Sequence, residues 1–173
     1  MDAGGTNPSV TWHDEMEREL SRIEESALYS GQSQFAQTKI WRTVNIGLGV
    51  PGATLAALSG GIGLANPGGR STAAILALIA AGLTAVVTTL NPTHKAERAH
   101  HSGNAYLDLQ NRTRVFRTID LRRLDYSEAR QGFQLLEDRR TDINREAEVP
   151  FALAYWMAKR NIRRGGTTYE VDK

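Results

Sequence analysis

Charged residues are missing from the middle of this chain and dense on both sides of it. No Asp, Glu, Lys or Arg lies between Arg42 and Arg70, and none lies between Arg70 and Lys95. The two uncharged runs, residues 43–65 and 71–90, each approach the ~20 residues that a helix needs to cross a ~30 Å hydrocarbon core. Neither alternates as a strand would, and the NPGGR sequence between them is typical of a turn. The pattern predicts a two-helix transmembrane hairpin.

A buried helical pair in a soluble protein is the main alternative, because the first run is only weakly hydrophobic. Between Ile46 and Ala65 seven residues are Leu, Ile or Val, and six are Gly. Each Gly inside a soluble helix costs about 1 kcal/mol relative to Ala, whereas Gly is common in membrane helices. No other segment is apolar enough to cover two such helices. We therefore expect an all-α membrane protein.

Helical periodicity continues on both sides of the apolar runs. Residues 12–41 are predicted to form one helix, and residues 92–166 are predicted to form further helices, one of them over 127–145. Residues 1–11 are small and polar and are expected to be disordered, which leaves a single domain over 12–173. The first helix has an apolar stripe at steps of three and four: Met16, Leu20, Ile23, Ala27, Gly31 and Phe35.

The junction after the second apolar run has the chemistry of a helix start. Asn91 is a favoured N-cap residue, and Pro92 suits the first helical position because it has no N–H to leave unbonded.

Small residues gather on one face of each apolar run and bulky residues on another. The small stripes are Gly49, Ala53, Ala56, Gly60 and Gly63, and Ala74, Ala77, Ala81, Thr84 and Thr88. The bulky stripes are Leu48, Pro51, Leu55, Leu58 and Ile62, and Leu76, Ile79, Leu83, Val86 and Leu90. Helices in lipid associate through small residues, because these let backbones approach closely. The small positions are therefore expected either to pack the two helices together or to face an oligomeric pore, and the sequence does not separate the two.

Charge sets the expected orientation in the membrane. Lys39 and Arg42 precede the first apolar run and Lys95 and Arg98 follow the second, whereas the turn offers only Arg70. Positive residues stay on the cytoplasmic side, so both termini are expected there. No secretory signal is expected, because the first apolar run begins behind an acidic helical segment. Cysteine is absent, which excludes disulfides and thiolate zinc sites.

The basic C-terminal half admits several interpretations. Residues 94–173 contain sixteen basic and twelve acidic side chains, while residues 1–42 contain four basic and seven acidic ones. Such a balance suits an anionic lipid surface, nucleic acid, an anionic ligand, or simply a mixed-charge helical surface, which is the interpretation we favour. The segment 150–166 mixes aromatic and basic residues, so it is expected either to lie on lipid or to dock on the other cytoplasmic helices.

No catalytic motif stands out. The chain has no Walker-type glycine loop, no G-x-S-x-G and no H-E-x-x-H. His94, Glu97 and His101 have the spacing of one helix face, so a metal is conceivable, but a solvated or headgroup-facing cluster is the simpler interpretation. We therefore expect no enzymatic activity, no cofactor, no metal and no nucleic-acid partner.

The order of these features resembles the SLATT family, the SMODS- and SLOG-associating two-transmembrane effector domains of bacteria. The resemblance rests on an acidic helix ending in FAQTKIW, the two apolar runs, Asn-Pro leading into AERAHHSGNAYLDLQNRTR, and a final segment before YEVD. It implies a protein of the bacterial inner membrane that oligomerises and permeabilises that membrane when a partner senses infection, often through a nucleotide signal. A non-conducting anchor or assembly subunit that binds a cytoplasmic partner is the alternative.

Overall fold

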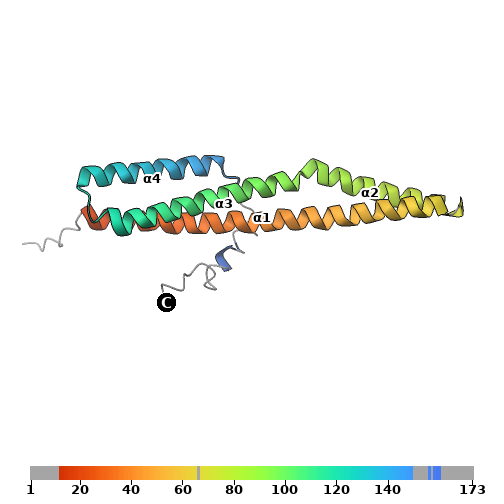
Figure 1. Ribbon diagram of the computed structural model, residues 1–173, viewed down its shortest axis with the longest axis horizontal. Coiled ribbons are helices and arrows are strands. Elements are labelled where there is room, and N and C mark those ends of the chain that lie inside the picture. The colour runs from red at the N-terminus through yellow and green to blue at the C-terminus, as the bar shows by residue number, and fades with distance from the viewer. Residues whose placement is uncertain (1–11, 66, 150–155, 157, 161–173) are drawn as a thin grey trace, which may run out of the picture. The chain divides into compact units, whose positions relative to one another are not determined.

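The computed structural model describes residues 12–65, 67–149, 156 and 158–160, and every element in them is helical (Figure 1). The main helices are α1 (Trp12–Ala65), α2 (Arg70–Leu90), α3 (Pro92–Val115) and α4 (Tyr126–Glu146). A 3₁₀ turn, η1 (Pro67–Gly69), precedes α2, and a π-helical turn, η2 (Phe116–Asp120), follows α3.

The chain divides into two compact units. The apolar unit is Ala36–His100, and the polar unit is Met1–Phe35 together with His101–Lys173. α1 and α3 each contribute residues to both units. The segments 12–41 and 43–65, which the sequence pattern predicts as separate helices, form one continuous helix, α1. No Gly or Pro lies near Thr43, so nothing in the local sequence ends the helix.

Three helical segments build the core of the polar unit. The predicted stripe of α1 is buried from Met16 to Ala27, with Leu20 wholly inaccessible to solvent. The helix predicted over 127–145 is α4, and its inner face packs against the same core. The core residues are Met16, Leu20, Ile23 and Ala27 of α1, Tyr106 and Leu109 of α3, Leu121, and Ala129, Leu136 and Ile143 of α4.

Close helix approach and a buried phenol tie the polar unit together. A Cβ on Gly31 would lie 3.3 Å from the Cβ of Tyr106, so α1 and α3 approach more closely there than larger residues allow. The Tyr106 hydroxyl donates to Asn144 Oδ1 at 2.7 Å, which connects α3 to α4. Burial raises the pKa of the Tyr106 phenol, and the charge of Arg140 opposes the rise.

A reciprocal cap begins α4. The Asp125 carboxylate accepts from the Glu128 backbone N–H at 2.9 Å, and the Glu128 carboxylate accepts from the Asp125 backbone N–H at 3.3 Å. These bonds to the backbone and to the Ser127 hydroxyl lower the pKa of Asp125, because they favour its charged form.

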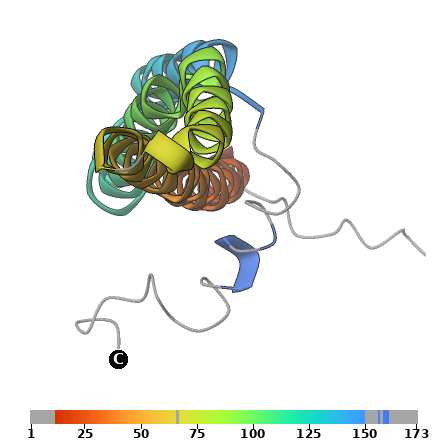
Figure 2. The ribbon, with the colours of Figure 1, turned by 90° about the vertical axis from the view of Figure 1, so that its right-hand side faces the viewer.

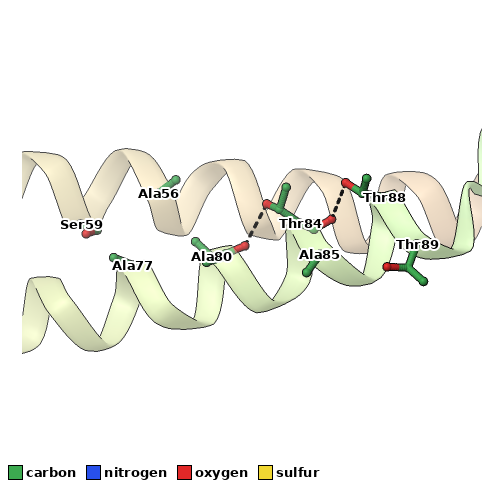
Figure 3. A pocket seen from close by; sticks show the side chains of 9 residues that line it. Ala56, Ser59, Ala77, Ala80, Thr84, Ala85, Thr88 and Thr89 are labelled. Atoms are coloured by element: carbon green, nitrogen blue, oxygen red, sulfur yellow. Dashed lines mark hydrogen bonds between the residues drawn. The ribbon is translucent and has the colours of Figure 1, made fainter.

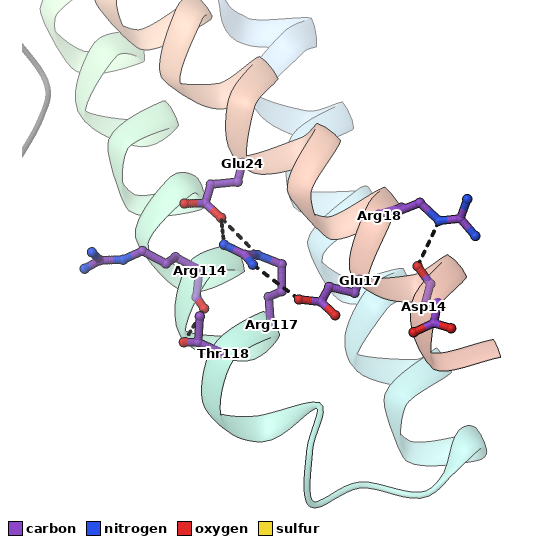
Figure 4. A network of polar contacts seen from close by, with 7 residues as sticks. All are labelled: Asp14, Glu17, Arg18, Glu24, Arg114, Arg117 and Thr118. Carbon is purple, nitrogen blue, oxygen red and sulfur yellow. Dashed lines mark hydrogen bonds and ion pairs between the residues drawn. The ribbon is translucent and has the colours of Figure 1, made fainter. Parts of the chain in front are cut away.

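Arg117 of η2 joins the end of α3 to α1 inside the polar unit (Figure 4). Its Nε and Nη2 both donate to Glu24 Oε2, at 3.2 and 3.0 Å, and Nη1 lies 3.6 Å from Glu17 Oε1. The π turn is defined by the Leu121 N–H, which donates to the Phe116 carbonyl. The polar unit thus has both an apolar core and partly buried ion pairs between its helices.

The segment predicted as a helix over 150–166 lies outside the described residues, apart from Trp156 and residues 158–160, which are helical. The predicted disorder of residues 1–11 also lies outside them.

Candidate functional site

Two stretches of helix in the apolar unit are long and apolar enough to cross a membrane. They belong to α1 and to the helix that begins at Arg70, and only 6% and 11% of their apolar windows are buried inside the chain. A core helix of a soluble protein would be mostly buried instead. Large aliphatic residues therefore point outward, including Ile46, Leu58, Leu64, Ile75 and Leu78.

The two apolar helices meet through a narrow strip. A Cβ on Gly52 would lie 3.4 Å from the Cβ of Leu83, and a Cβ on Gly63 would lie 3.5 Å from that of Ala73. Both pairs show that the helices are antiparallel. The Ser59 hydroxyl donates to the Ala73 carbonyl at 2.8 Å, so one hydrogen bond also crosses between the helices.

Most of the predicted small positions lie beside this strip rather than in it. At 100° per residue, the small stripe lies roughly 50° from the contact on α1 and roughly 100° from it on α2. All nine proposed packing or pore-facing positions are exposed: Gly49, Ala53, Ala56, Gly60, Gly63, Ala77, Ala81, Thr84 and Thr88. Among the three glycines of the α1 stripe, Gly63 alone has an atom of α2 within 4 Å of its added Cβ, from Ala73.

Five of these positions come together in one open groove, which we call the small-residue groove (Figure 3). Its volume is about 720 Å³. Its lining combines both apolar helices: Ala56 and Ser59 of α1, and Ala77, Ala80, Ala81, Thr84, Ala85, Thr88 and Thr89 of α2. The other four predicted positions, Gly49, Ala53, Gly60 and Gly63, do not line this groove. Conversely, four residues of the lining were not predicted: Ser59, Ala80, Ala85 and Thr89. Two of them, Ala85 and Thr89, continue the small stripe at steps of four from Ala81.

The polar side chains that line the small-residue groove all carry hydroxyl groups. The hydroxyl of Thr84 donates to the Ala80 carbonyl, and that of Thr88 donates to the Thr84 carbonyl, both at 2.9 Å (Figure 3). No charged side chain lines the groove. The side chains of this surface are small, so another helix can approach it closely.

Asn91 forms a sharp junction between α2 and α3. Its backbone is left-handed (φ 44°, ψ 57°), and its N–H donates to the Val87 carbonyl, which ends α2. Its side-chain Oδ1 accepts from the His94 backbone N–H at 3.4 Å, and α3 begins at the buried Pro92. Asn is among the few residues that adopt this conformation readily. One residue thus closes one helix and caps the next.

Basic and aromatic groups gather at the end of the apolar unit next to this junction. The Lys95 ammonium lies 4.6 Å from the centre of the Trp41 ring, within the range of a cation–π contact. The Thr38 hydroxyl donates to the Ala96 carbonyl at 3.4 Å, so α1 and α3 are neighbours here. Lys39 and Arg42 are exposed at the same level of α1.

The histidine-rich face does not form a metal site in the part of the chain that the structure describes. No three His, Asp or Glu side chains there lie close enough together to hold an ion. His94, Glu97 and His101 are each exposed. The small-residue groove is therefore the strongest candidate site among the described residues.

Comparison with protein-family models, with curated proteins and with solved structures gives no match.

Proposed function

We propose that the apolar unit is a two-pass transmembrane hairpin of a bacterial inner membrane, with both termini and the polar unit in the cytoplasm. The large outward-facing aliphatic residues support this, because water would penalise them and lipid would not. Lys39, Arg42 and Lys95 support the orientation, since they lie at the end opposite the η1 turn, which is followed only by Arg70. Trp41 beneath Lys95 suits the membrane–water interface.

The proposed function is that of a membrane effector in a bacterial conflict system. It oligomerises through the small-residue groove and permeabilises the inner membrane when activated, and its trigger is a nucleotide-signalling or sensor partner. The observation that carries this proposal is the groove itself. The hairpin packs through other residues and leaves five predicted small positions on one open surface. Lipid gains little from such a surface, whereas a neighbouring helix can approach it closely.

The resemblance to the SLATT family supplies the trigger and the biological setting of this proposal. No charged side chain lies between Arg42 and Arg70 or between Arg70 and Lys95. Any pore built from these helices therefore has no ring of charge to select ions, and we expect poor selectivity. We propose no catalytic activity for the chain.

Membrane depolarisation after inducible expression in a bacterium tests the proposal. The informative variant is Ala56→Leu, which fills the small-residue groove, and its matched control is Ala57→Leu. Ala57 is also exposed on α1 but lies outside the groove, so the two variants add the same volume to the same helix. We expect the intact protein and Ala57→Leu to depolarise cells and to form large oligomers in detergent, and Ala56→Leu to lose both the depolarisation and the large oligomers.

Ion flux from liposomes separates the proposal from the anchor alternative. If cells expressing the intact protein remain polarised, the purified protein is reconstituted with candidate signalling nucleotides and with the products of neighbouring genes. Flux under any of these conditions supports the effector. Oligomers without flux under all of them favour a non-conducting assembly subunit, whose partner surface would lie on the polar unit.

A further inference from the structure

A second groove lies in the polar unit, between the end of α3 with η2 and the face of α4 (Figure 2 shows these helices end-on). Its volume is about 820 Å³. We call it the cytoplasmic groove, and its lining is apolar in the middle and charged toward both ends. The residues that matter here are Val115, Phe116 and Asp120 on one side, and Gly132, Leu135 and Arg139 on the other.

Gly132 sets the depth of the cytoplasmic groove. A Cβ built on Gly132 would overlap the ring of Phe116, so the ring lies directly against the backbone of α4. The ring therefore forms the floor of the groove, and Val115 and Leu135 also line it. These two side chains are 45% and 70% exposed and line the same groove, so they form an apolar patch there.

The charges at the two ends of the cytoplasmic groove have opposite signs. Arg139 lies at one end, beside an Arg112–Asp108 ion pair of 2.9 Å that is neutral overall. Asp120 lies at the other end. Among the described residues, neither Arg139 nor Asp120 has an ion-pair partner. When a second copy is turned by 180° about an axis perpendicular to such a groove, its positive end faces the negative end of the first copy, and its negative end faces the positive end.

The exposed apolar residues lie where the axis of such a two-fold contact would pass. α3 and α4 are antiparallel, because Phe116 packs on Gly132 and Tyr106 bonds to Asn144. These pairs place Arg139 level with about Gln110 on α3. The midpoint between that level and Asp120 falls near Val115, and the same level on α4 falls next to Leu135. The groove therefore has its exposed apolar residues at the centre and complementary charges at equal distances on both sides.

We propose that the cytoplasmic groove binds a second copy of this chain in a two-fold symmetric contact. Leu135 of each copy packs on the Phe116 floor of the other, and Arg139 of each copy pairs with Asp120 of the other. This contact involves none of the residues of the small-residue groove. Because two different contacts can link more than two copies, the pair of grooves allows an assembly larger than a dimer.

Site-specific cross-linking of the full chain in detergent tests the proposal directly, since the natural sequence has no cysteine. Leu135→Cys places a thiol near the proposed axis, and a short bifunctional thiol reagent should convert it to covalent dimers. Gln134→Cys is the matched control, because Gln134 is the preceding exposed residue of α4 but does not line the groove. The proposal is overturned if Gln134→Cys cross-links as efficiently as Leu135→Cys.

Charge reversal then identifies the partner surface. In the Leu135→Cys background, Arg139→Asp sets like charges against each other twice per dimer and should weaken cross-linking at least about tenfold. Adding Asp120→Arg restores opposite charges and should restore the dimer. Failure of this rescue, or cross-linking only to a different protein in cells, overturns the two-fold contact. Ala56→Leu should leave these dimers intact while removing larger oligomers, so the two proposed contacts fail separately.

Discussion

The two units of this chain differ in the exposure of their large apolar side chains. In the polar unit Leu20, Ile23 and Leu109 are at most 1% exposed, whereas in the apolar unit Leu64 and Leu78 are 91% and 73% exposed. Alanines fill the buried positions of α2. The polar unit follows the rule for a protein in water, where burial of large apolar groups drives folding. The apolar unit follows the rule for helices in lipid, where small residues allow close approach and large ones face outward.

The largest expected effect comes from removing a buried leucine side chain of the polar unit, with an exposed leucine of the apolar unit as its comparison. Leu20→Ala should lower the free energy of unfolding by about 2–5 kcal/mol, because it leaves a cavity in the polar core. Leu78→Ala should leave it nearly unchanged, since that side chain contacts little within the chain. Chemical unfolding in detergent, followed by circular dichroism, measures both. Equal losses would mean that Leu78 is buried in a contact between copies or that the two units share one core.

A medium effect is expected from adding side chains to glycines on α1. Gly31→Leu should destabilise the polar unit by roughly 1–3 kcal/mol, because a Cβ there already lies 3.3 Å from the Cβ of Tyr106. Gly47→Leu should be tolerated, since no atom lies within 4 Å of its added Cβ. Hydrogen exchange of peptides from residues 12–35 and 101–115 should accelerate only in the first variant. Acceleration in both would contradict the difference in packing between the units.

The smallest effect is expected from acid. The pKa of Asp125 is lowered in the folded chain, so its contribution to stability is present above the unfolded pKa of about 3.9 and is lost as pH falls through the lower folded value. Asp125→Asn keeps a capping side chain that does not titrate. Hydrogen exchange of α4 should therefore depend more on pH between about 5 and 2 in the natural chain than in the variant.

The apolar unit serves as an internal reference for the acid experiment. The segment 43–69 contains no ionisable side chain, and neither does the segment 71–93. Protection of α2 should therefore vary little over the same pH range. If α2 loses protection together with α4, the stability of the apolar unit depends on the polar unit.

Local patterns predicted the elements well. The apolar stripe of α1 is buried, α4 lies within one residue of its predicted ends, and α3 begins at Pro92. Two features were not predicted. The continuity of α1 through residues 41–43 reflects the absence of a helix breaker, and the π turn at Phe116–Asp120 has no distinctive composition.

The sequence by itself determined the helical class, the extent of the two uncharged apolar runs and the asymmetry of charge at their ends, because each depends on residues close together in the chain. Only the tertiary structure decided which faces of the helices meet. A stripe at steps of three and four marks a face but not its partner. The fit of Gly52 against Leu83 and of Gly63 against Ala73 places the contact roughly 50° from the small stripe on α1 and roughly 100° from it on α2. Shape complementarity between segments distant in the chain therefore leaves the small-residue groove open.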